Sequence, residues 1–354
     1  MSMEKTRDEL LDLHHALGTG EKPRSGVCLR SPEAPSHESM RRSVEALAPA
    51  FRRAPVAVGW IEGGREVTGT FGRTLTGAVD AGTTFDLGDV SELFTGLLLA
   101  EMCQRGELAL HDRLYAHLPA DLRLAIGPVG QQTSLGDCAA HGTALPYLPE
   151  ALGSGDFGRH DHVMALERML PAVERGPSPW GVALLGLALA NRAGKAYGAL
   201  LRERVLEPLG MGHTHLRSER GVFGIHANGR DWNGAETPRP PRAPDFDPCR
   251  GVRASLGDLM RFARAHLDDG PLHRPAQMTL VPRLGGPVDG QLMGLAWHGD
   301  DDSVHRKLGQ ARGSRCHIAI DRLRRRAVVV LAAHHSFPVT ELIEAFTPSP
   351  DDHP

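Results

Sequence analysis

The stretch FDLGDVSELFTGLLLAEMCQRGELALHD, residues 85–112, decides how this chain is organised. It starts as an extended apolar segment and continues into a long helix that we expect to end near Gly106, since glycine is common just beyond helix C-termini. Two β-rich runs that precede it, separated by Gly63-Gly64, predict a hairpin. The strands predicted on its two sides are PVAVGWIE (55–62), GREVTGTFG (64–72), MGLAWHG (293–299), SRCHIAID (314–321) and RAVVVLAAH (326–334). Strands from both ends of the chain therefore bracket a mostly helical middle.

Composition excludes several classes of protein. The 354 residues carry a formal charge of -3, which excludes a generally basic nucleic-acid binder. Five cysteines without CxxC spacing favour free thiols over a disulfide framework or a zinc site. The neighbouring histidines lie in separate predicted elements, so they do not supply the three or four convergent ligands that a metal site needs. The start MSMEKTRDELLDLHH lacks the apolar core of a signal peptide, and the longest apolar run, residues 181–190, is about half of a membrane span. We expect a cytoplasmic protein with no metal, cofactor, membrane or nucleic-acid partner.

The helical segments and the division of the chain follow from periodicity and from glycine and proline. Helices are predicted over residues 4–17, 38–52, 133–141, 183–209, 255–267 and 338–346, and a proline-dense loop over 236–248. We expect residues 1–40 to be an N-terminal extension, residues 41–110 and 251–354 to form one α/β subdomain, and residues 111–250 to form a helical subdomain.

Several strings resemble, in the expected order, the serine β-lactamase and penicillin-binding-protein superfamily, in its class C-like branch of esterases, D-aminopeptidases and acyltransferases. Besides residues 85–112, they are TSLGDCAAHGTALPYLP (133–149), WGVALLGLALANRAGKAYGALLRERVLEPLGMGHT (180–214), GVRASLGDLMRFARAHL (251–267) and MGLAWHG. The likeness covers about residues 40–340. It implies an α+β, β-lactamase/transpeptidase-like fold, with an antiparallel sheet flanked by helices and an inserted all-α subdomain.

The nucleophile and base of that superfamily are missing. Its SxxK motif places a Ser at a helix start and a Lys one turn later, and the positions similar to these hold Asp89 and Glu92. Ser91 does not replace the nucleophile, because two residues along a helix turn its side chain about 200° away. The resemblance therefore implies a protein that is not a covalent serine hydrolase.

The second and third motifs of the superfamily are altered as well. The places of the proton-shuttling Tyr or Ser and the Asn fall at Pro177 and Pro179, which cannot shuttle a proton. The K-T/S-G motif survives in part as Lys307, Leu308 and Gly309, without the middle hydroxyl.

Two interpretations of Asp89, Glu92 and Lys307 stay open. Asp followed three residues later by Glu has the form of a capping box, and with Lys307 nearby the trio would be a salt-bridged remnant. Alternatively the old acyl pocket is refitted for acid–base chemistry. Two close carboxylates and one lysine would then favour a cation or a proton. Repulsion between the carboxylates raises one carboxyl pKa, whereas the helix N-terminus favours both charges, and the sequence does not decide between these effects. Lys307 would hold an oxyanion or a carboxylate of the substrate.

Further residues could line such a pocket. Trp180 and Trp297 lie beside motif positions and could wall the pocket, with core packing as the favoured alternative. Arg315 and His317 share one strand face that could bind an anionic group or be a solvated edge. The substrate-binding candidates are Trp180, Trp297, Gly309, Arg312, Arg315 and His317. His141 belongs to a segment that is structural in the superfamily.

The leading hypothesis for function is a repurposed, non-hydrolytic enzyme of specialised metabolism. Asp89, Glu92 and Lys307 would perform carboxylate-mediated cyclisation, isomerisation or elimination on a small molecule. A cytoplasmic location argues against peptidoglycan processing and β-lactam resistance. The alternative is an inactive pseudoenzyme that binds a small molecule or a partner protein.

Overall fold

The computed structural model describes residues 35–47, 54–147, 159–168, 176–219, 224–238, 243–285, 292–299 and 303–346. The chain divides into two units, residues 1–30 and 31–354, and all described residues belong to the second. The helix predicted over residues 4–17 lies outside them. The finer division of the second unit into an α/β and a helical subdomain stays a prediction.

The structure contains an antiparallel sheet of eight strands in the order β2-β1-β11-β10-β9-β8-β7-β6. This order confirms the expected antiparallel sheet built from both ends of the chain. The first strand of the hairpin therefore pairs with the last strand of the chain, with Val56 opposite Ala332. The strands are β1 (Val56–Glu62), β2 (Arg65–Phe71), β6 (Leu284–Gly285), β7 (Leu292–Met293), β8 (His298–Gly299), β9 (Val304–Ala311), β10 (Ser314–Asp321) and β11 (Arg326–Ala332). A separate three-stranded sheet contains β3 (Thr84–Asp86), β5 (Val252–Ser255) and β4 (His215–Leu216), in that order.

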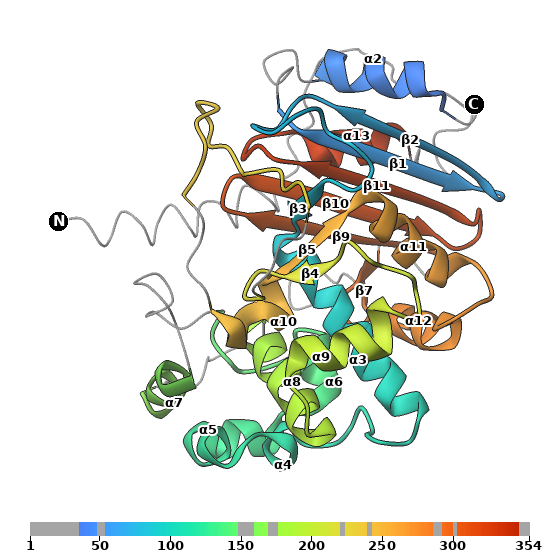
Figure 1. The fold of residues 1–354 in the computed structure, drawn as a ribbon. Helices are drawn as coiled ribbons and strands as arrows, with labels where there is room; N and C mark the ends of the chain where they lie inside the picture. The colour runs from blue at the N-terminus through green and yellow to red at the C-terminus, as the bar shows by residue number, and fades with distance from the viewer. Residues whose placement is uncertain are drawn as a thin grey trace. The chain divides into compact units, whose positions relative to one another are not determined.

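Helices cover both faces of the large sheet (Figure 1). The α-helices are α2 (His37–Leu47), α3 (Ser91–Gln104), α4 (Leu114–His117), α5 (Ala120–Gln132), α6 (Leu135–Ala139), α7 (Arg159–Glu167), α8 (Pro179–Ala193), α9 (Tyr197–Leu201), α10 (Asp247–Arg250), α11 (Leu256–Leu267), α12 (His273–Leu280) and α13 (Val339–Phe346). The described residues also contain the 3₁₀ turns η2 (Gly88–Val90) and η4 (Pro244–Phe246) and the π-turn η3 (Arg202–Leu206). α2 and α13 enclose a smaller core on one face, and α11 packs on the other.

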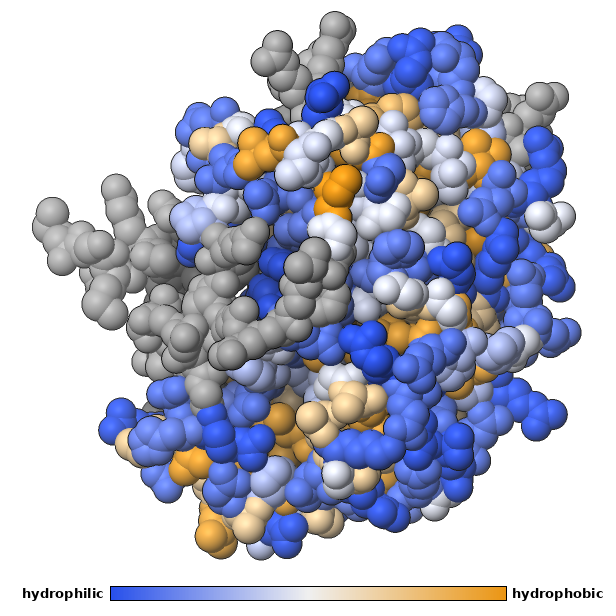
Figure 2. All heavy atoms as spheres, viewed as in Figure 1, coloured by the Kyte–Doolittle hydropathy of each residue, from blue (hydrophilic) through white to orange (hydrophobic). Residues whose placement is uncertain are grey.

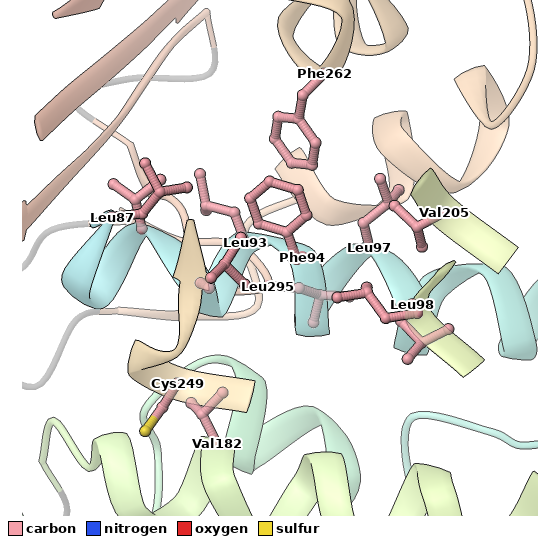
Figure 3. Close-up of a cluster of buried hydrophobic side chains, with 14 of the residues drawn as sticks. Leu87, Leu93, Phe94, Leu97, Leu98, Val182, Val205, Cys249, Phe262 and Leu295 are labelled. Carbon is pink, nitrogen blue, oxygen red and sulfur yellow. The ribbon is translucent and has the colours of Figure 1, made fainter. Parts of the chain in front are cut away.

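Helix α3 is the centre of the larger core. All its residues from Ser91 to Met102 are buried, which fits a helix that is apolar almost all round. Phe94 packs on Phe262 of α11 with ring centroids 4.7 Å apart, and Val182 of α8 and Val205 of η3 belong to the same cluster (Figure 3). Hydrophilic residues predominate on the face shown in Figure 2, with apolar residues in small groups between them.

Three local predictions are corrected. The helix predicted over 183–209 starts earlier, at Pro179, and ends its first part at Gly194, whose φ of +64° closes α8. MGLAWHG is not one strand: Ala296, at a φ of +66°, turns the chain between β7 and β8. The proline-dense run 236–248 ends in helix, because Pro248 occupies the first turn of α10, where its missing N–H needs no partner.

Candidate functional site

Two glycines bring strand β9 against the start of α3. A Cβ on Gly88, whose φ is +53°, would lie 2.2 Å from the carbonyl oxygen of Gln310. A Cβ on Gly309 would lie 2.1 Å from the carbonyl oxygen of Leu87. Only a residue without a side chain allows this approach. The contact places Lys307, two residues before Gly309, beside the first turn of α3.

A buried polar network joins three distant segments at this point. Lys307 Nζ donates to Glu92 Oε2 over 2.5 Å, and His141 Nε2 lies 3.0 Å from the same oxygen. The Ser178 N–H donates to His141 Nδ1 over 3.3 Å, so we assign the ring proton to Nε2, which then donates to Glu92. The side chains of Glu92, Lys307 and His141 are at most 6% exposed. The expected proximity of Glu92 and Lys307 is therefore present, with His141 as a third member.

The surroundings of Glu92 decide the direction in which its pKa shifts. Burial by itself would raise the pKa of its carboxyl group, but the charge of Lys307 and the hydrogen bond from His141 outweigh it and hold the pKa well below its ordinary value. Glu92 is therefore ionised at neutral pH and is not a carboxyl with a raised pKa. Its second oxygen, Oε1, has no hydrogen-bond partner among the described residues.

Asp89 belongs to a second, more exposed group. Arg250 of α10 donates through Nε to Asp89 Oδ1 over 2.6 Å and through Nη2 to the Tyr147 hydroxyl over 2.7 Å. The Asp89 side chain is 21% exposed, the Arg250 side chain 26%, and Tyr147 42%. Burial, opposed by Arg250, raises the pKa of Tyr147 to about 12, so its hydroxyl stays protonated at neutral pH.

These contacts correct two expectations about the carboxylates. Neither η2 nor α3 has a side-chain cap, so Asp89 and Glu92 do not form a capping box. The charges of Asp89 and Glu92 are matched by Arg250 and Lys307, which removes the expected bias toward a cation. His298 does not add a charge, because burial and the nearby Lys307 lower its pKa to about 3.

The sheet separates Lys307 from two predicted binding residues. Lys307 pairs with Ile318, and residues opposite each other in an antiparallel pair point to the same face. Arg315 and His317 lie on the other face, toward α13, where Arg315 donates to the carbonyl of Phe337 over 3.3 Å. The structure therefore does not bring them to Lys307. Arg312 lies in the exposed turn between β9 and β10.

Both predicted tryptophans pack in the core. Trp180 is 1% exposed and donates its indole N–H to His162 Nδ1 over 3.1 Å. Trp297 is fully buried, edge to face with His266 at a centroid distance of 5.2 Å. Of the two interpretations of these tryptophans, pocket wall and core packing, the structure supports core packing.

The segment of Pro177 and Pro179 has a structural role. Between the two prolines, Ser178 caps α8: its Oγ accepts from the Gly181 N–H over 3.0 Å and donates to the carbonyl of Pro146 over 2.8 Å.

Ser91 Oγ is buried and accepts from the Val252 N–H over 3.0 Å, in keeping with the sequence argument against it as a nucleophile.

Sequence reasoning missed His141, Tyr147 and Arg250. His141 has a left-handed backbone, φ 56°, which is uncommon for a residue with a side chain and aims its ring at Glu92. The sequence signal for His141 was its position among small residues, where a histidine side chain can reach a neighbouring segment. Arg250 had none, because 161 residues separate it from Asp89 in the chain.

Comparison with known proteins identifies the family. The family model for Beta-lactamase matches residues 41–343, so the chain belongs to the β-lactamase family. A β-lactamase of Pseudomonas fluorescens is 28% identical over 61% of this chain and 60% of the relative. Penicillin-binding protein 4 of Amycolatopsis lactamdurans is 26% identical over 54% of this chain and 53% of the relative. The matches thus span about half to two thirds of these curated relatives.

Solved structures show the same fold. A class C β-lactamase from Rhodobacter sphaeroides aligns with a TM-score of 0.73 at 21% identity, covering 87% of this chain and 97% of the other. A class C β-lactamase in complex with cefoxitin aligns with a TM-score of 0.74 at 19% identity, covering 88% of this chain and 98% of the other.

Within the described part of this chain, no helix has the length and apolar character of a membrane span, and no three His, Cys, Asp or Glu side chains converge as metal ligands.

Proposed function

We propose that this β-lactamase-family chain binds a small molecule non-covalently at the Asp89 site and does not form an acyl-enzyme. One observation carries the proposal: the two carboxylates at the start of α3 are already paired, Glu92 with Lys307 and Asp89 with Arg250. An acyl transfer of the serine type needs a nucleophile and a free base. Glu92 is ionised, but it is buried and holds two hydrogen bonds, so it is a poor base.

The partly exposed group of Asp89, Arg250 and Tyr147 is suited to recognition. Asp89, Arg250 and Tyr147 come from three separate segments and are linked by two hydrogen bonds, so they hold each other in place. The relatives are described as β-lactamases and as a D-alanyl-D-alanine-carboxypeptidase/endopeptidase. We therefore propose an amide-bearing small molecule of the acyl-peptide or β-lactam class as the ligand.

The experiment has a covalent and a non-covalent arm. In the first, the full chain is incubated with a fluorescent penicillin and its intact mass is measured, and we expect no increase. In the second, metabolites from an extract of the source organism that stay on the protein are identified by mass spectrometry. We expect a metabolite to be retained by the wild type and lost from Arg250→Gln. The matched control Arg322→Gln, in the exposed turn after β10, should retain it.

The outcomes separate the alternatives. A stable penicillin adduct on the wild type would overturn the proposal. Retention of the metabolite by Arg250→Gln at the level of the wild type would also contradict it, because the ligand would then not be bound at this site.

A second candidate function, the non-hydrolytic enzyme of specialised metabolism working in the cytoplasm, is favoured by one observation. Asp89 is a carboxylate that is partly exposed, and a substrate can reach it more easily than Glu92. Asp89 would then move the proton, with Arg250 next to it. Conversion of an extract metabolite by the wild type but not by Asp89→Asn/Glu92→Gln would establish this function in place of simple binding.

A further inference from the structure

The face of the large sheet that is turned away from Lys307 has an apolar half and a basic half. On β1 and β11 this face carries aliphatic side chains and Trp60, which pack with α2 and α13 (Figure 1). On β9 and β10 it carries Arg306, Arg315 and His317. Charged side chains are rarely buried on a sheet face unless a partner neutralises them, so the basic half needs a physical reason.

The strand register brings the three basic side chains together. Arg315 and His317 are two residues apart on β10, and Arg306 of β9 pairs with Ala319, the next residue of β10 on the same face. His317 therefore lies between the two arginines, at the diagonal spacing that long side chains can span. Burial and the charges of Arg306 and Arg315 lower the pKa of His317 to about 3, so its ring is neutral.

The imidazole of His317 is enclosed without a partner. The residue is 5% exposed, and its Nδ1 has no hydrogen bond among the described residues. A buried nitrogen in this state has lost its hydrogen bonds to water without replacing them, which lowers stability. Because β10 is an inner strand of the sheet, between β9 and β11, a solvated edge does not describe this position. The ring is therefore suited to a ligand rather than to solvent.

Arg315 carries a positive charge that its surroundings do not neutralise. Its Nη1 donates to the carbonyl of Phe337 over 3.3 Å, and its Nε has no partner among the described residues. Burial lowers the pKa of Arg315, against the attraction of Glu341, which forms no ion pair with it. A half-buried guanidinium group without a carboxylate beside it attracts an anion more strongly than one in water does.

We propose that Arg315 and His317, with the neighbouring Arg306, bind a phosphate group on the sheet face opposite the Asp89 site. Two guanidinium groups supply two positive charges, and a phosphate group supplies between about one and two negative ones. Its oxygens can accept from both guanidinium groups and from the His317 Nε2–H together. A carboxylate has two oxygens, which one arginine fork already occupies. This site is separate from the Asp89 site and does not depend on the proposed function.

Calorimetry on the full chain tests binding and distinguishes two sources of the phosphate group. The protein is titrated at pH 8 and constant ionic strength with inorganic phosphate, with glycerol 3-phosphate and with acetate. We expect saturable binding of at least one phosphate compound, with a Kd of about 1 mM or below, and weaker binding of acetate. Tighter binding of glycerol 3-phosphate would identify a phosphate ester as the ligand, and tighter binding of inorganic phosphate would identify the free ion.

NMR of the histidine rings locates the bound phosphate. The chain is labelled with ¹⁵N in its histidines, and the His317 resonances are assigned by their absence in His317→Gln. We expect the ring nitrogens of His317 to shift on addition of phosphate, because the anion accepts from Nε2 and favours protonation of the ring. This readout uses the wild-type fold, so it holds even where a variant of Arg315 is less stable.

Variants separate this site from the Asp89 site. Arg315→Gln should weaken phosphate binding about 10- to 100-fold, and Arg315→Lys, which keeps the charge but not the fork, should weaken it less. The matched control Arg312→Gln, in the exposed turn between β9 and β10, should bind as the wild type does, and so should Arg250→Gln.

Three results would overturn the proposal. These are the absence of saturable phosphate binding, an unchanged affinity in Arg315→Gln, and His317 resonances that do not move. Loss of phosphate binding in Arg250→Gln, with full binding in Arg315→Gln, would assign the anion to the Asp89 site instead. Neither result would affect the proposal that a ligand binds at the Asp89 site without forming an acyl-enzyme.

Discussion

Removal of the ammonium group of Lys307 tests the buried network most directly. Lys307→Met keeps the length of the stem but leaves the Glu92 carboxylate buried with His141 alone. At 2.5 Å and an effective dielectric constant of about 20, the lost attraction is about 7 kcal/mol, partly offset because Lys307 no longer has to be desolvated. Breaking a buried ion pair by removing one partner typically lowers stability by about 3–5 kcal/mol, and we expect a loss in this range at pH 8.

The loss should depend on pH in a defined direction. In the wild type the folded pKa of Glu92 lies below its unfolded value, so its stabilisation is fully present above the unfolded pKa and is lost only in strong acid. In Lys307→Met, burial dominates and raises the folded pKa above the unfolded value. Stability of the variant then falls as pH rises through the folded pKa. The difference between wild type and variant should therefore be larger at pH 8 than at pH 5.

Urea unfolding followed by circular dichroism at pH 5 and pH 8 measures both effects. Lys195→Met removes the lysine of an exposed Lys–Glu pair and is the matched control, with a far smaller and pH-independent change. Glu92→Gln/Lys307→Met should recover most of the stability, since it leaves no unpaired charge. A loss below about 1 kcal/mol for Lys307→Met, or an equal loss at both pH values, would refute the electrostatic reasoning.

Three further outcomes follow from single contacts. Gly309→Ala should lower the free energy of unfolding by about 3 kcal/mol in the same urea assay, because its Cβ meets a backbone oxygen that cannot move away, and an unchanged midpoint would contradict the close approach. Burial, opposed by the Ser218 hydroxyl, raises the pKa of Asp247 to about 7. Because this pKa lies above the unfolded value, the free energy of unfolding should fall as pH rises from 4 to 7. Asp247→Asn should flatten that slope and be more stable than the wild type at pH 8. Ser91→Ala should lower stability by about 1 kcal/mol through the lost acceptor for Val252 and leave the intact mass after penicillin treatment unchanged, whereas loss of an adduct would identify Ser91 as a nucleophile.

Much of the fold was predictable because its signals are local. Gly63 and Gly64, both at positive φ, form the turn of the predicted hairpin, and the strand-like runs SRCHIAID and RAVVVLAAH located β10 and β11. The apolar run after Ser91 predicted a long helix, which is α3 in the structure. MGLAWHG failed because its apolar residues have the composition of one strand, while Ala296 turns the chain between two.

The candidate site was predictable only in part. Sequence reasoning located Lys307 beside Glu92 through the family resemblance, and the structure places them in contact. It grouped Arg315 and His317 correctly on one strand face but could not relate that face to Lys307, since this depends on how β10 pairs with β9. It also attached Asp89 to the Glu92 network, whereas Arg250 holds it separately.

The sequence by itself determined the β-lactamase-like fold and placed two carboxylates, Asp89 and Glu92, at the start of a helix, because both depend on local pattern and order along the chain. Only the tertiary structure decided the state of those side chains. The pKa of Glu92 depends on Lys307, 215 residues away, and on His141, because electrostatic interactions follow distance in space and burial. The same two carboxylates could have formed an acid–base pair, but their partners turned them into two ion pairs.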